Sequence, residues 1–261
     1  MTITDGRTHH PVALAAPRDR LLRMCVHMPV DDGSMGPAAA RVLVTADVLL
    51  RTVEATGRQL DWVVDFPDAR AAEQTEAVRV LAAALGTHVP SGFTAEGGAR
   101  DVLGGPADVD VFGDGRRDAE QGLWLEVGTV RQVGAPEPHP ARDADALDVR
   151  LDLLGHPYHR AATLTPRTLA DAGRTLTRWR GRVAGWARTP SQPVPEEYRR
   201  RAADALATDL ATPAVLNLLL RAESAEDLPD GAKFETFAYL DRILGLELAR
   251  EVGRVPVGEG S

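Results

Sequence analysis

The sequence is poor in three residue types on which many functional sites depend. All but one of its 30 basic residues are arginines, so a mechanism that needs a mobile ammonium group has only Lys233 as a candidate. Cys25 is the only cysteine, which excludes a disulfide within the chain and fits a reducing compartment. Aromatic residues make up only 5%, so we expect a core built mainly from Leu, Val and Ala.

Long apolar runs are absent as well. No run approaches the roughly 20 residues that a membrane-spanning helix requires. The first twenty residues, MTITDGRTHHPVALAAPRDR, lack the apolar segment of a signal peptide. The net charge of −8 argues against general binding to nucleic acid, which needs a surplus of basic residues. We therefore expect a soluble, cytoplasmic protein that does not bind membranes.

The residues that are present predict two kinds of layer. Residues 20–28 and 60–66 read as apolar strands, and the segment AAARVLVTADVLLRTVEAT reads as a helix that stops at Gly57. Its apolar residues recur at helical spacing and are expected to be buried: Val42, Ala46, Leu49, Leu50 and Val53. From Ala146 onward helical segments follow one another. This order favours an α/β fold, a Rossmann-like layer followed by an α-helical bundle.

The same pass along the chain predicts its domains. Residues 1–20 read as a flexible N-terminal arm, 21–145 as a Rossmann-like nucleotide-binding core, 146–252 as a helical bundle, and 253–261 as a flexible tail. The segment LWLEVGTVRQVG reads as a β-hairpin or a kinked strand. Trp179 and Trp186 lie seven residues apart on one helix face, which indicates core packing and not a stacking platform.

The stretch CVHMPVDDGSMGPAAARVLVTADVLLR (25–51) resembles a nucleotide site. A polar turn containing Asp31, Asp32, Ser34 and Gly36 lies between an apolar strand and a long apolar helix. Phosphate groups bind at such a helix N-terminus because backbone amides and the helix dipole point toward them. The ordinary alternative for the two aspartates is turn formation before a glycine.

Several segments, taken in order, resemble cysteinyl-tRNA synthetases and the related cysteine ligase of mycothiol synthesis, members of the class I aminoacyl-tRNA synthetase family. Cys25 stands eleven residues before Gly36, the spacing that the family keeps between a zinc-binding cysteine and the glycine of its HIGH motif. The helix ADVLLRTVEATG and the strand ending in DFPD follow. Further on, ALDVRLDLLGHPYHRAATLT, DLATPAVLNLLL and YLDRILGLEL are similar to later segments of the family. The resemblance implies a shortened, divergent paralogue with a class I catalytic core followed by a helical bundle. It also implies that no anticodon-binding domain is available to hold tRNA.

The family's catalytic motifs are not retained. At the HIGH position residues 34–37 read SMGP, and at the KMSKS position residues 134–138 read GAPEP. In the family the histidines and lysines of these motifs stabilise the pyrophosphate as its charge develops. Losing one such preorganised contact typically costs about 2.7–4 kcal/mol in the transition state, so we expect no efficient amino-acid activation. Arg131, His139 or Arg142 are the candidates for compensation.

The zinc site that the resemblance implies is also incomplete. The family holds zinc with two cysteines, a histidine and a glutamate, and here only Cys25 remains. The segment that matches the family's FPHHENE reads FGDGRRD, which offers Asp114 and Asp118. A new site from Cys25, His27 and Asp31 or Asp32 is an alternative, but ligands on one strand would mostly need to alternate faces. We therefore expect no bound metal, and Cys25 as a buried, small apolar residue.

Three functions are compatible with these residues. The preferred one is a degenerate synthetase-like binding or accessory protein with a remnant adenylate pocket, for which ATP is one candidate ligand. The second is a repurposed ligase or transferase that joins an amino acid, such as cysteine, to a small amine. The third is an interaction module whose bundle pairs with a protein partner or with itself. The pocket residues common to the first two are Cys25, His27, Asp31, Asp32, Ser34, Gly36, Asp114 and Asp118.

Overall fold

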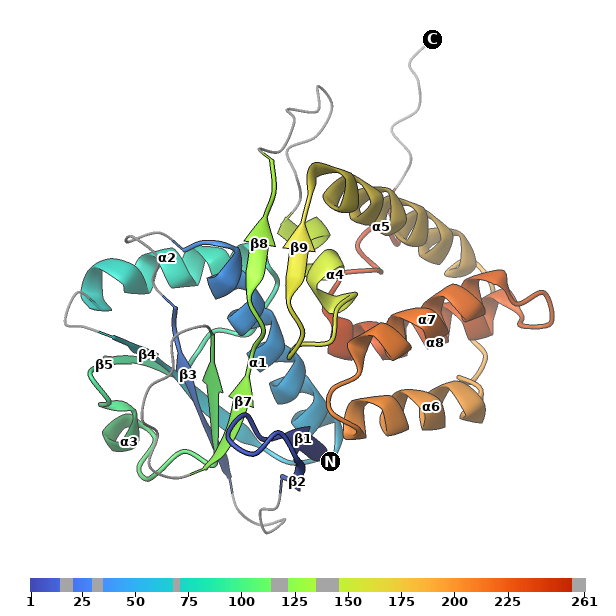
Figure 1. Cartoon of the computed structure of the whole chain (residues 1–261). Coiled ribbons are helices and arrows are strands. Elements are labelled where there is room, and N and C mark those ends of the chain that lie inside the picture. Colours follow the sequence, from blue (N-terminus) through green and yellow to red (C-terminus); the bar gives the residue numbers. More distant parts are fainter. Residues whose placement is uncertain (15–20, 30–34, 68–70, 114–121, 135–145, 255–261) are drawn as a thin grey trace.

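A computed structural model describes residues 1–14, 21–29, 35–67, 71–113, 122–134 and 146–254. A twisted β-sheet with its covering helices forms one half of the molecule, and a bundle of helices forms the other (Figure 1). Among the described residues, no helix combines the length and the apolar character needed to cross a bilayer.

The main sheet has five parallel strands in the order β5-β4-β3-β6-β7. Their bounds are β3 (Leu22–His27), β4 (Leu60–Phe66), β5 (Gly92–Ala95), β6 (Val109–Phe112) and β7 (Leu123–Glu126). The chain starts at the centre with β3, moves outward through β4 and β5, and returns to the other side of β3 with β6 and β7. This is the doubly wound Rossmann order, and its topological switch point lies between β3 and β6.

The two faces of this sheet are covered unequally. Helix α1 (Pro37–Ala55) packs on one face, where Leu22, Met24 and Val26 of β3 join one continuous core. All five apolar positions predicted for α1 are buried, as expected. Helix α2 (Ala71–Ala84) connects β4 to β5. On the opposite face the four-residue helix α3 (Ala99–Val102) lies over a small cluster that includes Cys25 and Leu103, and Arg7 lies over the ring of Trp124.

Five helices make up the second half of the molecule: α4 (Ala146–Leu154), α5 (Pro166–Trp186), α6 (Glu196–Ala207), α7 (Thr212–Ser224) and α8 (Asp230–Leu244). Trp179 and Trp186 are both buried and pack edge-on against Phe237, so the interpretation of these tryptophans as core residues is confirmed. The predicted α/β class, a Rossmann-like layer followed by a helical bundle, is confirmed too.

A second small sheet corrects the hairpin expected over LWLEVGTVRQVG. β7 belongs to the main sheet, whereas β8 (Val130–Gln132) pairs in parallel with β9 (Ala162–Leu164). The two short strands stand upright between the main sheet and the bundle (Figure 1). Parallel pairing requires a long connection, so this partner could not be found among the adjacent residues.

The first fourteen residues form a hairpin in place of the expected loose arm. β1 (Thr2–Thr4) pairs with β2 (Pro11–Ala13) in antiparallel register, and the side chain of Ile3 is completely buried. The carboxylate of Asp209, at the end of α6, accepts hydrogen bonds from the amide and the hydroxyl of Thr4 at 2.8 and 2.9 Å. These contacts fasten the hairpin to the bundle.

A buried charge network joins α1 to the bundle. Asp47 accepts hydrogen bonds from Arg150 of α4 at 2.6 Å, from Arg51 at 2.7 Å and from the ring of His88 at 2.7 Å. Asp47 and Arg150 are both completely buried. A buried carboxylate is tolerated only when its oxygen atoms are paired in this way, so the network fixes the orientation of α4 on α1.

Candidate functional site

The carboxyl ends of β3, β6 and β7 meet at the topological switch point, where doubly wound folds bind ligands. A cavity of about 110 Å³ opens there beside the first turns of α1. Its described lining consists of Pro29, Ala38, Val42, Gly113, Val127, Gly128, Thr129 and Val130. No residue of this described lining carries a charged side chain, so among the described residues a phosphate group would meet backbone amides and the helix dipole.

The first turn of α1 shapes this cavity. Gly36 is the N-cap residue in an extended conformation, without a side-chain cap, and Pro37 occupies the first turn, where its missing amide costs nothing. The guanidinium of Arg41 does not face the cavity, because it donates to the carbonyl oxygens of Gly128, Thr129 and Pro157 at 3.1, 2.9 and 2.9 Å. Arg41 therefore holds the chain that walls the cavity and is not available to bind a phosphate.

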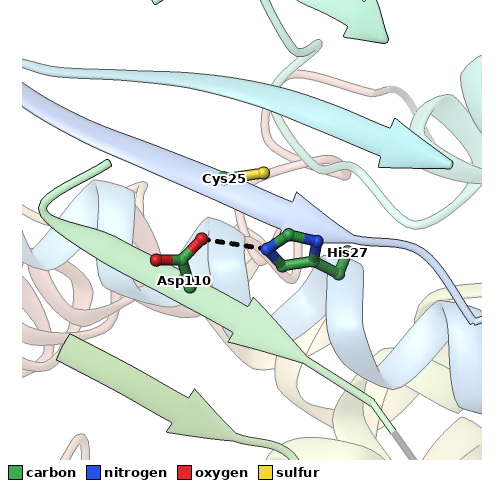
Figure 2. Close-up of side chains that lie close together, drawn as sticks. All are labelled: Cys25, His27 and Asp110. Carbon is green, nitrogen blue, oxygen red and sulfur yellow. Dashed lines mark hydrogen bonds and ion pairs between the residues drawn. The ribbon is translucent and has the colours of Figure 1, made fainter. Parts of the chain in front are cut away.

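A second group of polar side chains lies on the sheet face turned away from α1. Cys25 and His27 lie two residues apart on β3, and Asp110 of β6 is the register partner of Cys25 (Figure 2). The ring nitrogen Nε2 of His27 lies 2.9 Å from Oδ1 of Asp110, and the ring stacks on Phe112 with 4.3 Å between centroids. One sulfur, one nitrogen and one oxygen atom of Cys25, His27 and Asp110 all lie within 4.8 Å of one another.

The second nitrogen of His27 faces another carboxylate. Nδ1 lies 3.6 Å from Oδ2 of Asp65, the residue opposite His27 on β4. Asp65 is itself held in place, because its Oδ1 accepts hydrogen bonds from the hydroxyl of Thr94 at 2.8 Å and from the amide of Gly97 at 3.3 Å. The imidazole is therefore bracketed by carboxylates from both neighbouring strands.

Electrostatics at this cluster favour a positive charge. Burial disfavours the charged imidazole, but the carboxylates of Asp110 and Asp65 outweigh it and raise the pKa of His27 to about 11. Burial also opposes ionisation of Asp65, yet His27 and Thr94 lower the pKa of that carboxyl. Burial raises the pKa of the Cys25 thiol. At neutral pH the cluster holds an imidazolium between two carboxylates beside a protonated thiol, so Cys25 is not an activated nucleophile.

The sequence-predicted site residues fall into two groups. Cys25 and His27 are brought together on one sheet face, and Gly36 caps α1, where a Cβ atom would meet nothing within 4 Å. Asp31, Asp32, Ser34, Asp114 and Asp118 lie outside the described residues, as do His139 and Arg142. Arg131 is exposed on β8.

The alternation of side chains along a strand does not count against a joint role for Cys25 and His27. Side chains alternate with a period of two, so residues i and i+2 share a face. Asp65 and Asp110 were missed, although each had a signal in the sequence. Each is a carboxylate within a mainly apolar strand, LDWVVDF or VDVF, where a buried charge needs a partner.

Comparisons with known proteins find similarity in the fold and none in the sequence. No family model and no curated protein matches this chain. Its structure is similar to that of Thermus thermophilus arginyl-tRNA synthetase, with 10% identity over 90% of this chain and 83% of that chain and a TM-score of 0.46. A Campylobacter jejuni chain described as an arginyl-tRNA synthetase gives 9% identity over 91% and 93% of the two chains and a TM-score of 0.45.

Proposed function

We propose that this chain is a class I synthetase-like protein that binds a small ligand at the switch point and no longer activates an amino acid with ATP. It would act as a binding or accessory protein. The ordered resemblance of its segments to cysteinyl-tRNA synthetases supports the ancestry, and the switch-point cavity beside α1 supports the retained pocket.

The observation that carries the proposal is the chemistry around that cavity. No described lining residue has a basic side chain. A triphosphate needs several positive groups as its charge develops. This lining favours a ligand without a triphosphate, such as a nucleoside, over ATP.

Thermal denaturation with a ligand panel tests this proposal. The panel contains ATP, cysteine and cysteinyl-sulfamoyl adenosine, an adenylate analogue without a triphosphate. A ligand at 100 times its Kd stabilises the folded state by about 2.7 kcal/mol, which raises Tm by several degrees. We expect a larger shift with the analogue than with ATP. A large shift with ATP would contradict the loss of triphosphate binding, and no shift with any member would contradict a retained pocket for such ligands.

A pair of matched variants shows whether a shift comes from the switch-point cavity. Thr129→Trp places an indole at the exposed rim of the cavity and should abolish the shift. Thr163→Trp makes the same change at an exposed position of β9, outside the cavity lining, and should leave the shift unchanged. Equal loss in both variants would place the ligand elsewhere.

A second candidate function is a ligase or transferase that joins an amino acid, such as cysteine, to a small amine. The paired carboxylates of Asp65 and Asp110 favour it, because an ammonium group is recognised by ionised carboxylates. This candidate requires an activated amino acid as donor. It therefore predicts turnover of an adenylate or of aminoacyl-tRNA, which the binding protein would lack.

A further inference from the structure

The cluster on the far sheet face has the donor atoms of a transition-metal site. Cys25 offers a sulfur atom, His27 a ring nitrogen and Asp110 a carboxylate oxygen, all within 4.8 Å of one another. The register of β3 and β6 produces this convergence, since Cys25 lies directly opposite Asp110 and His27 follows on the same face. Figure 2 shows the three side chains projecting from neighbouring strands on the same side of the sheet.

The surroundings of His27 match those of a metal-binding histidine. Such a histidine usually presents one ring nitrogen to the metal and the other to a carboxylate that fixes its orientation. Nε2 of His27 points to Asp110, whereas Nδ1 faces Asp65 at 3.6 Å. Asp65 is anchored by Thr94 and Gly97, so it is placed to orient the ring and not to bind the metal itself.

We propose that Cys25, His27 and Asp110 bind one divalent transition-metal ion, Zn²⁺ in preference to Mg²⁺ or Ca²⁺, and that Asp65 positions His27. Mixed sulfur, nitrogen and oxygen donors suit zinc, whereas magnesium and calcium prefer oxygen atoms only. Three protein ligands leave a fourth tetrahedral position for solvent or an added ligand. Of these residues only Cys25 belongs to the four-ligand zinc set that the family resemblance implies.

To accept the ion, the three ligand atoms must shift by up to about 1 Å, since they lie within 4.8 Å of one another. Metal–ligand bonds of about 2.0–2.3 Å in a tetrahedron separate neighbouring ligand atoms by roughly 3.3–3.7 Å. Nε2 of His27 and Oδ1 of Asp110 lie 2.9 Å apart, so they must separate by about half an ångström. The ion replaces the proton between these two atoms and the proton of the Cys25 thiol, and both protons pass to solvent.

Burial explains why the ion would be retained. Cys25 is 2% exposed and Asp110 is 4% exposed, and the side chain of His27 is 13% exposed. Water competes poorly for ligands in such a position, while the partly exposed His27 marks the side from which the fourth position can be reached. The inference does not rest on the proposed function, since it requires neither a nucleotide nor an amino acid.

Cobalt titration of the full chain, purified in the presence of a chelator and then freed of it, tests the proposal. We expect one Co²⁺ per chain, with visible bands of tetrahedral cobalt and a thiolate-to-cobalt charge-transfer band in the near ultraviolet. Because Cys25 is the only cysteine, the charge-transfer band in the wild type already identifies its sulfur as a ligand. Stoichiometric Zn²⁺ should displace the cobalt and abolish all these bands. A titration without a charge-transfer band would overturn the proposal.

Variants separate the ligands from the positioning residue. Cys25→Ser should abolish the charge-transfer band, and Asp110→Asn should weaken cobalt binding by 100-fold or more. Asp65→Asn should keep the charge-transfer band but weaken binding about 10–100-fold, as expected for a residue that only orients a ligand. Asp61 lies four residues before Asp65 on the same strand. Asp61→Asn is therefore the matched control and should bind cobalt like the wild type. Equal binding by Asp110→Asn and Asp61→Asn would overturn the ligand set.

Discussion

The two faces of the five-stranded sheet carry different parts of the molecule's chemistry. The face under α1 belongs to one continuous apolar core, and the buried carboxylate of α1, Asp47, is paired with two guanidinium groups and an imidazole. Among the described residues, the opposite face has a small apolar cluster beneath α3, and the carboxylates of Asp65 and Asp110 lie on either side of one imidazole. The first face carries most of the apolar core, and the second carries the side chains of the proposed metal site.

The difference shows how buried charges are to be interpreted. Asp47 and Asp110 are both buried carboxylates, but their partners differ in number and kind. A carboxylate with two guanidinium partners and an imidazole has no capacity left for a ligand. A carboxylate whose described hydrogen-bond partner is one histidine can exchange that partner for a metal ion.

The largest expected effect comes from removing Asp47 from the buried charge network that joins α1 to the bundle. Asp47→Ala leaves the guanidinium of Arg150 completely buried without its carboxylate, and we expect a loss of about 3–5 kcal/mol in the free energy of unfolding. Urea denaturation measures it. Asp171→Ala, which removes an exposed ion pair with Arg174, should cost less than about 1 kcal/mol. Similar costs for the two variants would contradict the structural role of Asp47.

Replacing both Asp47 and Arg150 tests whether the cost of Asp47→Ala comes from the unpaired buried charge. The double variant Asp47→Leu/Arg150→Met removes both buried charges and should unfold at a higher urea concentration than Asp47→Ala, because no uncompensated charge remains. A double variant less stable than the single one would show that the network contributes more than mutual neutralisation.

The next effect compares the same substitution on the two faces. Leu49 of α1 lies in the continuous core and is completely buried, whereas Leu103 lies in the small cluster on the far face and is 6% exposed. We expect Leu49→Ala to cost about 3–4 kcal/mol and Leu103→Ala about 1–2 kcal/mol, since a cavity near the surface is relaxed or filled more easily. Equal losses in urea denaturation would contradict the unequal packing of the faces.

A smaller effect on stability is expected at the cluster of Cys25, His27 and Asp110. In metal-free protein, His27→Gln keeps a donor near Asp110 but removes the positive charge, and we expect a loss of about 1–2 kcal/mol. The cobalt charge-transfer band should weaken strongly in the same variant. If His27→Gln destabilised the fold as much as Asp47→Ala does, the far face would be a structural element and not a binding face.

The smallest expected effect concerns acid stability. Burial opposes ionisation of Asp47, but His88 and Arg150 outweigh it and hold the pKa of Asp47 far below its unfolded value. A carboxyl whose pKa is depressed by folding stabilises the protein above its unfolded pKa of about 3.9 and loses that contribution as the pH falls. The stability difference between wild type and Asp47→Asn should therefore narrow from pH 5 to pH 3. A difference that stays constant would contradict this assignment.

Much of the architecture could be predicted from the sequence because it depends on local periodicity. The apolar spacing of α1 marks its buried side, and the seven-residue spacing of Trp179 and Trp186 marks the bundle core. The N-terminal hairpin was not predictable from its polar, threonine-rich composition. Its contacts are with distant parts of the chain: Ile3 joins the main core, and Thr4 donates to Asp209, about two hundred residues away in the sequence.

The candidate site was only half predictable for a similar reason. Cys25 and His27 stand in one short stretch, and their shared face follows from the strand period. The contribution of Asp65 and Asp110 depends on the register of β3 with β4 and β6, which is set by long crossover connections and not by neighbouring residues. The buried Arg41, Asp47 and Arg150 were missed because each stands among apolar residues of a helix and has its partners elsewhere in the chain.

Amino-acid-dependent exchange of pyrophosphate into ATP is the measurement that tests the central claim most directly. It is performed on the zinc-supplemented full chain with each of the twenty amino acids, beside an active cysteinyl-tRNA synthetase as positive control. We predict exchange no faster than in the absence of amino acid for all twenty, because the described lining of the switch-point cavity carries no positive group to stabilise the leaving pyrophosphate. Exchange that depends on one amino acid, and that Thr129→Trp abolishes while Thr163→Trp does not, would contradict the account.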